Sequence, residues 1–315
     1  MRKLHLKTIL FSKRTFIILC IVLLLANGGT VWFFLATGNQ PQPNKYPLID
    51  VARQYVSQQD FVVNTTDLRD KMLDIVNAEP DNTVSVYFEF LNTGANISLN
   101  PDATFYPASL VKLASAMAVM KKVEDGTWSL DSRLVLSDQD KDSRFGTLYQ
   151  EPTGTSFSIR ELLMHLLIDS DTTAHNMFMR NLSSDDLANL EDAIGLDSLF
   201  DDSGDVSAKE YSRMFRALYS SSYLHRSNSE QLLSWLSQSS FNEYLQSGVP
   251  SGVTFAHKIG EDDVSNTYLD SGIVYTAQRP YLITVMINGH SKADAENIMK
   301  QLSQDAYQYV STYQK

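Results

Sequence analysis

The stretch Thr104-Phe105-Tyr106-Pro107-Ala108-Ser109-Leu110-Val111-Lys112 places a hydroxyl and an amine one helical turn apart, where a turn leads into an apolar helix. Behind it, apolar residues recur at helical spacing: Leu110, Leu113, Met117 and Met120. Side chains at positions i and i+3 of a helix lie about 5–6 Å apart between Cβ atoms, so the Lys112 amine can take a proton from Ser109. A serine at a helix start also lies beside free backbone N–H groups, which favour an oxyanion.

The same pair has a simpler interpretation, in which Ser109 caps a helix and Lys112 is a solvated lysine. Two later motifs favour the catalytic interpretation. Ser170-Asp171-Thr172 follows an apolar helical run, and Lys258-Ile259-Gly260 continues the apolar stretch that begins at Val253. A hydroxyl and a second cation could therefore join the first pair in the folded chain.

In this order, the three motifs Ser-x-x-Lys, Ser-Asp-x and Lys-x-Gly resemble those of the class A serine β-lactamases and the related penicillin-binding D,D-peptidases. The resemblance covers roughly residues 66–313. It implies an acyl-enzyme mechanism on a β-lactam or on a peptidoglycan peptide, with no cofactor.

The pattern of apolar residues predicts an α+β fold, and the resemblance implies that it is of the β-lactamase/transpeptidase-like type. An antiparallel five-stranded sheet would be flanked by helices, with an all-helical lobe inserted between its strands. We predict strands at 83–90, 95–99, 253–259, 267–276 and 281–287. We predict helices at 51–60, through Asn77 behind a cap at Thr65-Thr66-Asp67, from 108 to about 223 with a polar break at 137–156, and from 293 to about 312.

The N-terminal residues predict a membrane anchor. Residues 1–14 contain five basic residues and no acidic one, and residues 15–37 contain no charge. This length spans a bilayer, and the basic flank predicts a single-pass protein of the cell membrane with an extracytoplasmic domain. The rival is a cleaved signal peptide that ends near Ala26-Asn27-Gly28. We favour the anchor, because the apolar run resumes at 31–34.

These observations predict four parts of the chain: a cytoplasmic tail at 1–14, a transmembrane helix at 15–37, a linker at 38–62 and a serine hydrolase domain at 63–315. Without the five N-terminal basic residues, 21 basic residues stand against 37 acidic ones, a net charge of −16. This charge disfavours nucleic acid as a partner. Cys20, the single cysteine, lies in the apolar span, so the domain has neither a disulfide nor a thiol catalyst. Nothing in the sequence indicates an oligomeric state.

The resemblance implies four catalytic residues. Ser109 would be the nucleophile and Lys112 its base, with the charge of Lys258 and partial burial lowering the lysine pKa. Ser170 would relay a proton to the leaving nitrogen, although it can also serve as the N-cap of the following helix. Lys258 would attract the carboxylate of the substrate. Asp171 is predicted to brace its turn.

The substrate-binding residues implied by the resemblance are Thr172, Ile259, Gly260 and Glu261. Oxyanion donors would be the backbone N–H groups of Ser109 and Glu261. Thr172 stands in place of an asparagine, and Ile259 in place of a hydroxyl residue that would bind the carboxylate. Two lost hydrogen bonds, each worth about 1–3 kcal/mol, would weaken substrate binding about a hundredfold or more.

The chain also lacks the loop glutamate that activates water in class A enzymes. No Glu-x-x-x-Asn stands between the second and third motifs, and Glu191 lies too early, on a predicted helix. Asp201, Asp202 and Asp205 are near in sequence but are interpreted as solvated turn residues. We therefore expect deacylation to be slow.

The histidines show no metal-ligand spacing, so no metal site is predicted. His165, His175 and His225 lie on predicted helices and His257 on a predicted strand. An alternative function of another class stays open. The chain would then be a non-catalytic cell-wall binding or scaffolding protein with an eroded pocket, as Ile259 and Thr172 suggest.

Overall fold

The computed structural model describes residues 22, 25, 45–50, 63–80, 83–196, 199, 204–276 and 279–313. The chain divides into two units, Met1–Lys45 and Tyr46–Lys315, and the architecture below is that of the second unit. The predicted cytoplasmic tail, nearly all of the predicted membrane span and the predicted helix at 51–60 lie outside the described residues. Within the described residues, no helix is long and apolar enough to cross a bilayer.

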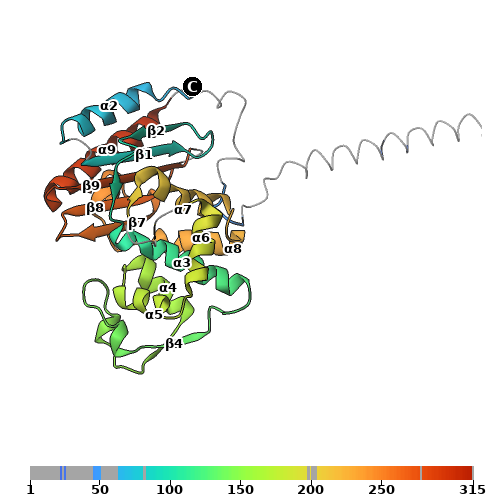
Figure 1. Cartoon of the computed structure of the whole chain (residues 1–315). Coiled ribbons are helices and arrows are strands. Elements are labelled where there is room, and N and C mark those ends of the chain that lie inside the picture. Colours follow the sequence, from blue (N-terminus) through green and yellow to red (C-terminus); the bar gives the residue numbers. More distant parts are fainter. Residues whose placement is uncertain are drawn as a thin grey trace, which may run out of the picture. The chain divides into compact units, whose positions relative to one another are not determined.

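Five antiparallel strands form one sheet in the order β2-β1-β9-β8-β7 (Figure 1). Their bounds are β1 Val84–Phe90, β2 Asn96–Leu99, β7 Thr254–Asp262, β8 Thr267–Tyr275 and β9 Tyr281–Asn288. The predicted antiparallel five-stranded sheet is confirmed. Strand β7 continues past its predicted end at Ile259, because cross-strand pairing with β8 extends to Asp262 and outweighs the turn-like composition of the acidic residues.

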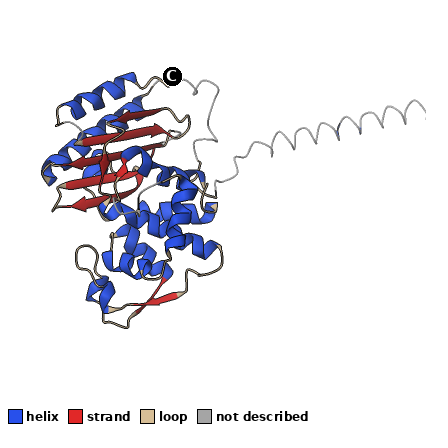
Figure 2. Cartoon of the chain, viewed as in Figure 1, coloured by secondary structure: helices blue, strands red, loops and turns tan. Residues whose placement is uncertain are grey.

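The two faces of the sheet pack against different helices. Helices α2 (Thr66–Asn77) and α9 (Lys292–Thr312) cover one face, and α7 (Ala208–Ser220) lies on the other (Figure 2). Residues of β9 alternate between the two cores, with Ile283 in the core shared with α9 and Leu282 in the core shared with α7. The site described below lies on the α7 side of the sheet, at its β7 edge.

A lobe of helices is inserted between β2 and β7 in the sequence, as predicted. Its helices are α3 Val111–Glu124, α4 Ile159–Ile168, α5 Thr172–Met179, α6 Ser184–Ile194, α7 and α8 Arg226–Leu236. The lobe is not all-helical, because β4 (Arg133–Val135) pairs with β5 (Ser156–Ser158). A second short pair joins β3 (Thr104–Phe105) to β6 (Val206–Ser207). Strands of two or three residues show too little alternation to be predicted.

Helix α8 was not predicted, because the helical pattern was expected to end near Tyr223. Its first turn, Arg226-Ser227-Asn228-Ser229, consists of polar residues that favour turns and caps. Its later residues Leu232 and Leu236 are fully buried. Packing of these side chains therefore outweighs the weak helix propensity of the first turn.

Side-chain capping fixes where several helices begin. Ser158, Ser183 and Ser207 each accept a backbone N–H of the first turn, and each is paired with an acidic residue three positions later in a capping box. The predicted cap at Thr65 is wrong in detail. Thr65 makes no side-chain capping bond, and the Asn64 side-chain oxygen accepts the first helical N–H instead.

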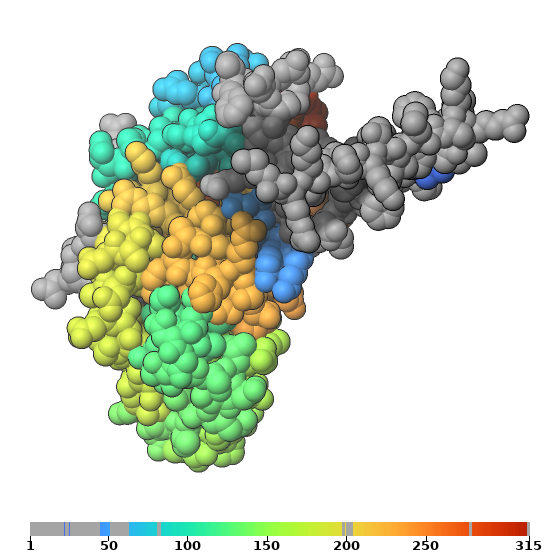
Figure 3. All heavy atoms as spheres, turned by 90° about the vertical axis from the view of Figure 1, so that its right-hand side faces the viewer, coloured from blue at the N-terminus to red at the C-terminus, as the bar shows by residue number. Residues whose placement is uncertain are grey.

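Residues 46–50, within the predicted linker, pack onto the domain. The Leu48 N–H donates to Glu230 Oε2 at 2.9 Å, and the Tyr275 hydroxyl donates to the Leu48 carbonyl oxygen at 3.0 Å. Ile49 is 2% exposed and belongs to the core on the α7 side. Figure 3 shows this segment in blue beside the orange surface that includes α8. The folded domain thus includes residues ahead of its predicted boundary.

Replacing Ile49 with alanine should lower the free energy of unfolding by about 2–4 kcal/mol, because a buried isoleucine side chain is removed. Urea unfolding monitored by circular dichroism would measure this. Val264→Ala is the matched control, since Val264 is 94% exposed and its replacement should change stability by less than about 0.5 kcal/mol. Equal stability of the two variants would show that residues 46–50 do not contribute to the fold.

Candidate active site

Ser109 lies at the start of the helix that carries Lys112. The 3-10 turn Ala108–Leu110 runs directly into α3. Ala108 has a φ of 45°, in the left-handed region, which costs a non-glycine residue about 1–2 kcal/mol. Ser109 is partly exposed, and its hydroxyl has no hydrogen-bond partner among the described residues. The hydroxyl is therefore open to an incoming acyl group.

Strand β7 lies against this turn, and Gly260 makes the close approach possible. A Cβ atom at Gly260 would stand 2.8 Å from the Pro107 carbonyl oxygen and 3.0 Å from Leu110 Cγ. A side chain at this position would push the strand away from the turn that carries Ser109. Gly260, predicted as a substrate-binding residue, thus has a packing role that the motif alone did not reveal.

The Lys112 side chain is 3% exposed, so its interpretation as a solvated lysine is wrong. Its Nζ donates to the Ser170 carbonyl oxygen and to Thr172 Oγ1 at 3.1 Å, and lies 3.3 Å from Ser170 Oγ. Within the described part of the chain it makes no hydrogen bond to Ser109. The amine must therefore turn from the second motif toward Ser109 to take its proton.

Ser170 connects the two lysines of the site. Lys258 is 1% exposed, and its Nζ lies 2.7 Å from Ser170 Oγ and 3.1 Å from the Ile259 carbonyl oxygen. A hydroxyl has one proton and two lone pairs. Ser170 can therefore accept a hydrogen bond from one amine and donate one to the other amine when that amine is neutral. The hydroxyl can thus pass a proton between the two motifs.

Asp171, not Ser170, caps helix α5. Asp171 Oδ1 accepts the Ala174 N–H at 2.8 Å, while Ser170 lies before the cap with a left-handed φ of 54°. The predicted capping role of Ser170 is therefore wrong. The left-handed turn at Ser170 instead lets its carbonyl and its hydroxyl both point toward Lys112.

The second carboxylate oxygen of Asp171 holds the loop that follows β4, which confirms its bracing role. Asp171 Oδ2 accepts the N–H groups of Thr147 at 2.7 Å and Leu148 at 3.0 Å. A Cβ at Gly146 would overlap this carboxylate, at 2.0 Å from Oδ2. Glycine is thus required at position 146, where φ is also positive.

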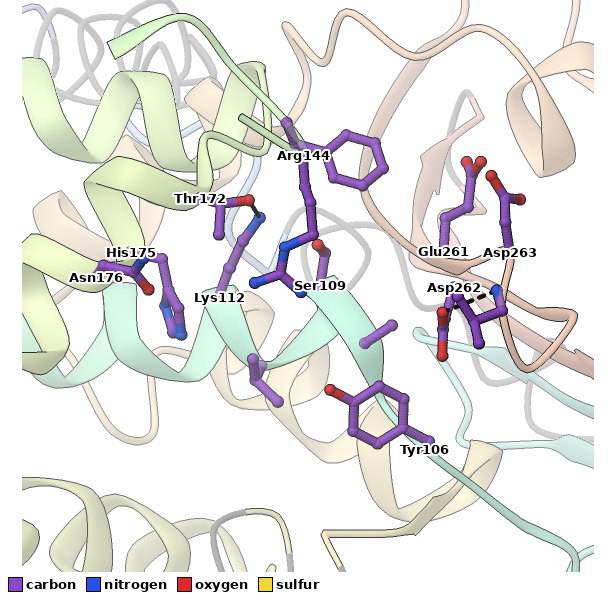
Figure 4. Close-up of a pocket in the computed structure, with 14 residues that line it drawn as sticks. Tyr106, Ser109, Lys112, Arg144, Thr172, His175, Asn176, Glu261, Asp262 and Asp263 are labelled. Carbon is purple, nitrogen blue, oxygen red and sulfur yellow. Dashed lines mark hydrogen bonds between the residues drawn. The ribbon is translucent and has the colours of Figure 1, made fainter. Parts of the chain in front are cut away.

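A cleft of about 530 Å³ opens over Ser109 (Figure 4). Most of its lining residues were not predicted from the motifs, among them Tyr106, Arg144, Phe145 and His175. The Phe145 ring lies 5.5 Å from Lys112 Nζ, where it excludes water from the amine. Arg144 forms a two-point ion pair with Asp142 at the cleft mouth. Tertiary hydrogen bonds bring this polar loop to the site, among them those of Asp171 and the bond from the Thr172 N–H to the Phe145 carbonyl oxygen, so no local sequence signal marks it.

Two predicted substrate-binding residues point elsewhere. Successive strand residues face opposite sides, so Ile259 faces the core shared with α9, where it is 1% exposed. Its side chain does not line the cleft, contrary to the prediction. The Glu261 side chain lies at the cleft edge, where it accepts from the Tyr244 hydroxyl at 3.0 Å and pairs with Lys292 at 2.6 Å. The role of its backbone N–H as an oxyanion donor stays a prediction.

The structure describes no loop glutamate in the cleft. Glu191 lies on α6, as predicted. Asp201 and Asp202 lie outside the described residues. Among the described residues there is also no group of histidine, cysteine and carboxylate side chains that could hold a metal ion.

Lys112 and Arg144 line the cleft, whereas Lys258 is buried behind Ser170 and is not among the lining residues. Burial, opposed by the charge of Asp171, lowers the pKa of Lys112 to about 7. Burial and the charge of Lys112 lower the pKa of Lys258 well below its ordinary value. A substantial fraction of Lys112 is therefore neutral at pH 7 and able to accept a proton.

Comparison with known proteins agrees with this geometry. The model of a family described as the Beta-lactamase enzyme family matches residues 67–310. The chain belongs to this family. The resemblance inferred from the three motifs is thus confirmed. Among curated proteins, Beta-lactamase 3 of Bacillus cereus is 21% identical over 229 residues, which cover 68% of this chain and 71% of that protein.

Several solved structures share the fold of this β-lactamase family member. PBP-A has a TM-score of 0.72 and 23% identity, covering 79% of this chain and 97% of its own. A mutant of PBP-A in an acyl-enzyme complex with penicillin G gives the same values. A β-lactamase from Sphaerobacter thermophilus has a TM-score of 0.71 and 19% identity, covering 80% and 99%. At these identities the likeness establishes the fold.

The pKa of Lys112 predicts how acylation of this β-lactamase family member depends on pH. Lys112 must be neutral to accept the Ser109 proton, and its neutral form grows as the pH rises through about 7. Adduct formation with a penicillin should therefore accelerate about tenfold per pH unit below this value and level off above it. Intact mass spectrometry between about pH 5.5 and 9 would measure the rate. A flat profile would contradict Lys112 as the base.

Proposed function

We propose that the protein is a serine acyl hydrolase that forms an acyl-enzyme on Ser109. The observation that carries the proposal is the open Ser109 hydroxyl at a helix start, beside a buried network of Lys112, Ser170 and Lys258. Each of these groups supplies a function that acyl transfer needs: a nucleophile, a base of suitable pKa and a proton path. Membership of the β-lactamase family supports the same reaction class.

The residues would act in a defined order. Neutral Lys112 takes the Ser109 proton as Oγ forms its bond to the acyl carbon. The oxyanion is stabilised by the backbone N–H groups of Ser109 and Glu261. The acyl C–N bond then breaks, and the leaving nitrogen receives a proton from Ser170, which is resupplied from the amine of Lys112 or Lys258. The chain is left with an ester at Ser109.

Two acyl donors fit this site: a β-lactam or a peptidoglycan-type peptide that ends in a D-alanyl carboxylate. The carboxylate of either would be bound by Lys258, whose pKa rises when a negative charge binds beside it. The penicillin acyl-enzyme of the PBP-A mutant supports a β-lactam as a working probe. We propose slow deacylation, because no described residue of the cleft corresponds to the loop glutamate of class A enzymes.

The non-catalytic scaffolding alternative loses one of its two sequence arguments. The Ile259 side chain lies in the core, so it does not by itself erode the cleft. Thr172 keeps its hydroxyl at 3.1 Å from Lys112, inside the network. The alternative remains as an outcome of the following experiment.

Incubation with benzylpenicillin should add one penicilloyl mass to the protein, and the adduct should persist after the excess drug is removed. Ser109→Ala should abolish the adduct. Lys112→Ala should slow its formation by about 10²–10⁴-fold, because the hydroxyl then lacks its base. Intact mass spectrometry over time measures both formation and loss.

Three results would contradict parts of the proposal. An adduct on the Ser109→Ala protein would overturn the nucleophile. Inertness of the unaltered protein toward several acyl donors would favour the scaffolding function. Hydrolysis of a chromogenic cephalosporin at many turnovers per second, without an initial burst, would overturn slow deacylation.

We further propose that the N-terminal segment at 15–37 anchors the domain on the outer face of the cytoplasmic membrane. The five basic residues before it and the absence of acidic residues there support this orientation. Cell fractionation followed by protease treatment of spheroplasts should find the domain membrane-bound and accessible from outside. A soluble secreted form that begins between Asn27 and Gln40 would show that the segment is a cleaved signal peptide.

A further inference from the structure

His175 lines the cleft beside Lys112, and the mechanism proposed above gives it no role. It lies on α5, one helical turn after Thr172, whose hydroxyl is bound to Lys112. In Figure 4, Lys112 lies between Ser109 and His175. An imidazole at this place adjoins the base of the site without contacting the nucleophile.

The hydrogen bonds of His175 determine which ring nitrogen carries the proton. The Ser115 hydroxyl donates to the Lys112 carbonyl oxygen at 3.0 Å. A hydroxyl has only one proton, so Ser115 Oγ must accept at its second contact, which is His175 Nδ1 at 3.1 Å. In a neutral ring, Nδ1 thus carries the proton and Nε2 keeps a free lone pair.

The surroundings keep this ring neutral. Burial, followed by the charges of Lys112, Lys258 and Arg144, lowers the pKa of His175 to about 3. Such a weak base does not hold a proton at neutral pH. It remains a good hydrogen-bond acceptor, because a neutral imidazole nitrogen accepts well.

We propose that His175 Nε2 holds the water that hydrolyses the acyl-enzyme at Ser109. This inference rests on the proposed function, since it needs an ester at Ser109. A water that donates one proton to Nε2 has its second proton free for Lys112 and a lone pair free for the acyl carbon. The ring of this uncharged acceptor is fixed by the hydrogen bond that His175 Nδ1 donates to Ser115, on the helix that also carries Lys112.

The hydrolytic step balances with these groups alone. The water oxygen bonds to the acyl carbon while neutral Lys112 takes one water proton. The bond between the acyl carbon and Ser109 Oγ then breaks, and Lys112 returns the proton to Oγ. His175 accepts a hydrogen bond throughout and does not change its protonation, as its low pKa requires. This arrangement gives slow but nonzero turnover without a carboxylate base.

The test measures acylation and deacylation separately in the full-length protein with benzylpenicillin, by intact mass. His175→Leu should slow loss of the adduct about tenfold, the effect of one hydrogen bond, and change its formation by less than about threefold. His175→Gln keeps an acceptor and should retain most of the deacylation rate. Ser115→Ala removes the hydrogen bond that keeps the His175 proton on Nδ1, so the ring can also carry its proton on Nε2. Deacylation should then be faster than in His175→Leu and slower than in the unaltered protein.

Treatment of the adduct with hydroxylamine distinguishes a loss of water positioning from general damage to the site. As a strong nucleophile it needs no positioning, so it should clear the adduct equally fast in His175→Leu and in the unaltered protein. His225→Leu is the matched control, because its side chain is 79% exposed and outside the cleft, and both rates should be unchanged.

Several results would overturn the inference: unchanged deacylation in His175→Leu, equal slowing of both steps, or failure of hydroxylamine to clear its adduct. If His175→Leu does not fold, Ser115→Ala decides the test: deacylation as fast as in the unaltered protein would overturn the inference. Absence of any adduct on the unaltered protein would instead refute the proposed function, so the two failures are distinguishable.

Discussion

Two lysine amines are buried around one hydroxyl, that of Ser170, and the rest of the site depends on this arrangement. Burial of a charged amine is unfavourable, so each lysine loses part of its affinity for protons. Hydrogen bonds that the amines donate to Ser170 and Thr172 compensate for the loss of water. The resulting neutral amine is what makes an ordinary serine at a helix start chemically useful.

The arrangement requires three distant parts of the chain to meet at close range. Gly260 brings β7 to within contact of the turn before Ser109, because any larger residue would collide with the Pro107 carbonyl oxygen. The left-handed turn at Ser170 aims its carbonyl and hydroxyl at one amine. The cleft is therefore a product of tight backbone packing more than of the motif side chains alone.

The sheet and the inserted lobe could be predicted from the sequence because each has a local signature, whereas the four central site residues were predicted from the resemblance of three motifs, and their roles stay predictions. Alternating apolar residues mark β1, a nearly continuous apolar run marks β9, and Ser109 and Lys112 stand at helical spacing. Strand alternation places the Ile259 side chain in the core, whereas the motif assigned it to the cleft. Arg144 and Phe145 could not be predicted, because only the tertiary contacts of their loop bring them to the cleft.

The neutral ring of His175 could not be predicted either. Its position on a helix was expected, but its state depends on charges from three separate segments and on a hydroxyl of a neighbouring helix. Such environment-dependent properties arise only after the chain has packed. They are therefore invisible to motifs and periodicity.

Asp171 accepts hydrogen bonds from two segments, and this has a consequence for how the site can change during evolution. One carboxylate fixes both the start of α5, next to Ser170, and the loop that carries Arg144 and Phe145. The wall that contacts a substrate and the hydroxyl that moves its proton therefore share Asp171 as an anchor, beside the backbone hydrogen bond from Thr172 to Phe145. Exposed loop residues such as Arg144 can be exchanged to admit new substrates while the anchor preserves the chemistry. A change at Asp171 itself would alter selectivity and rate together.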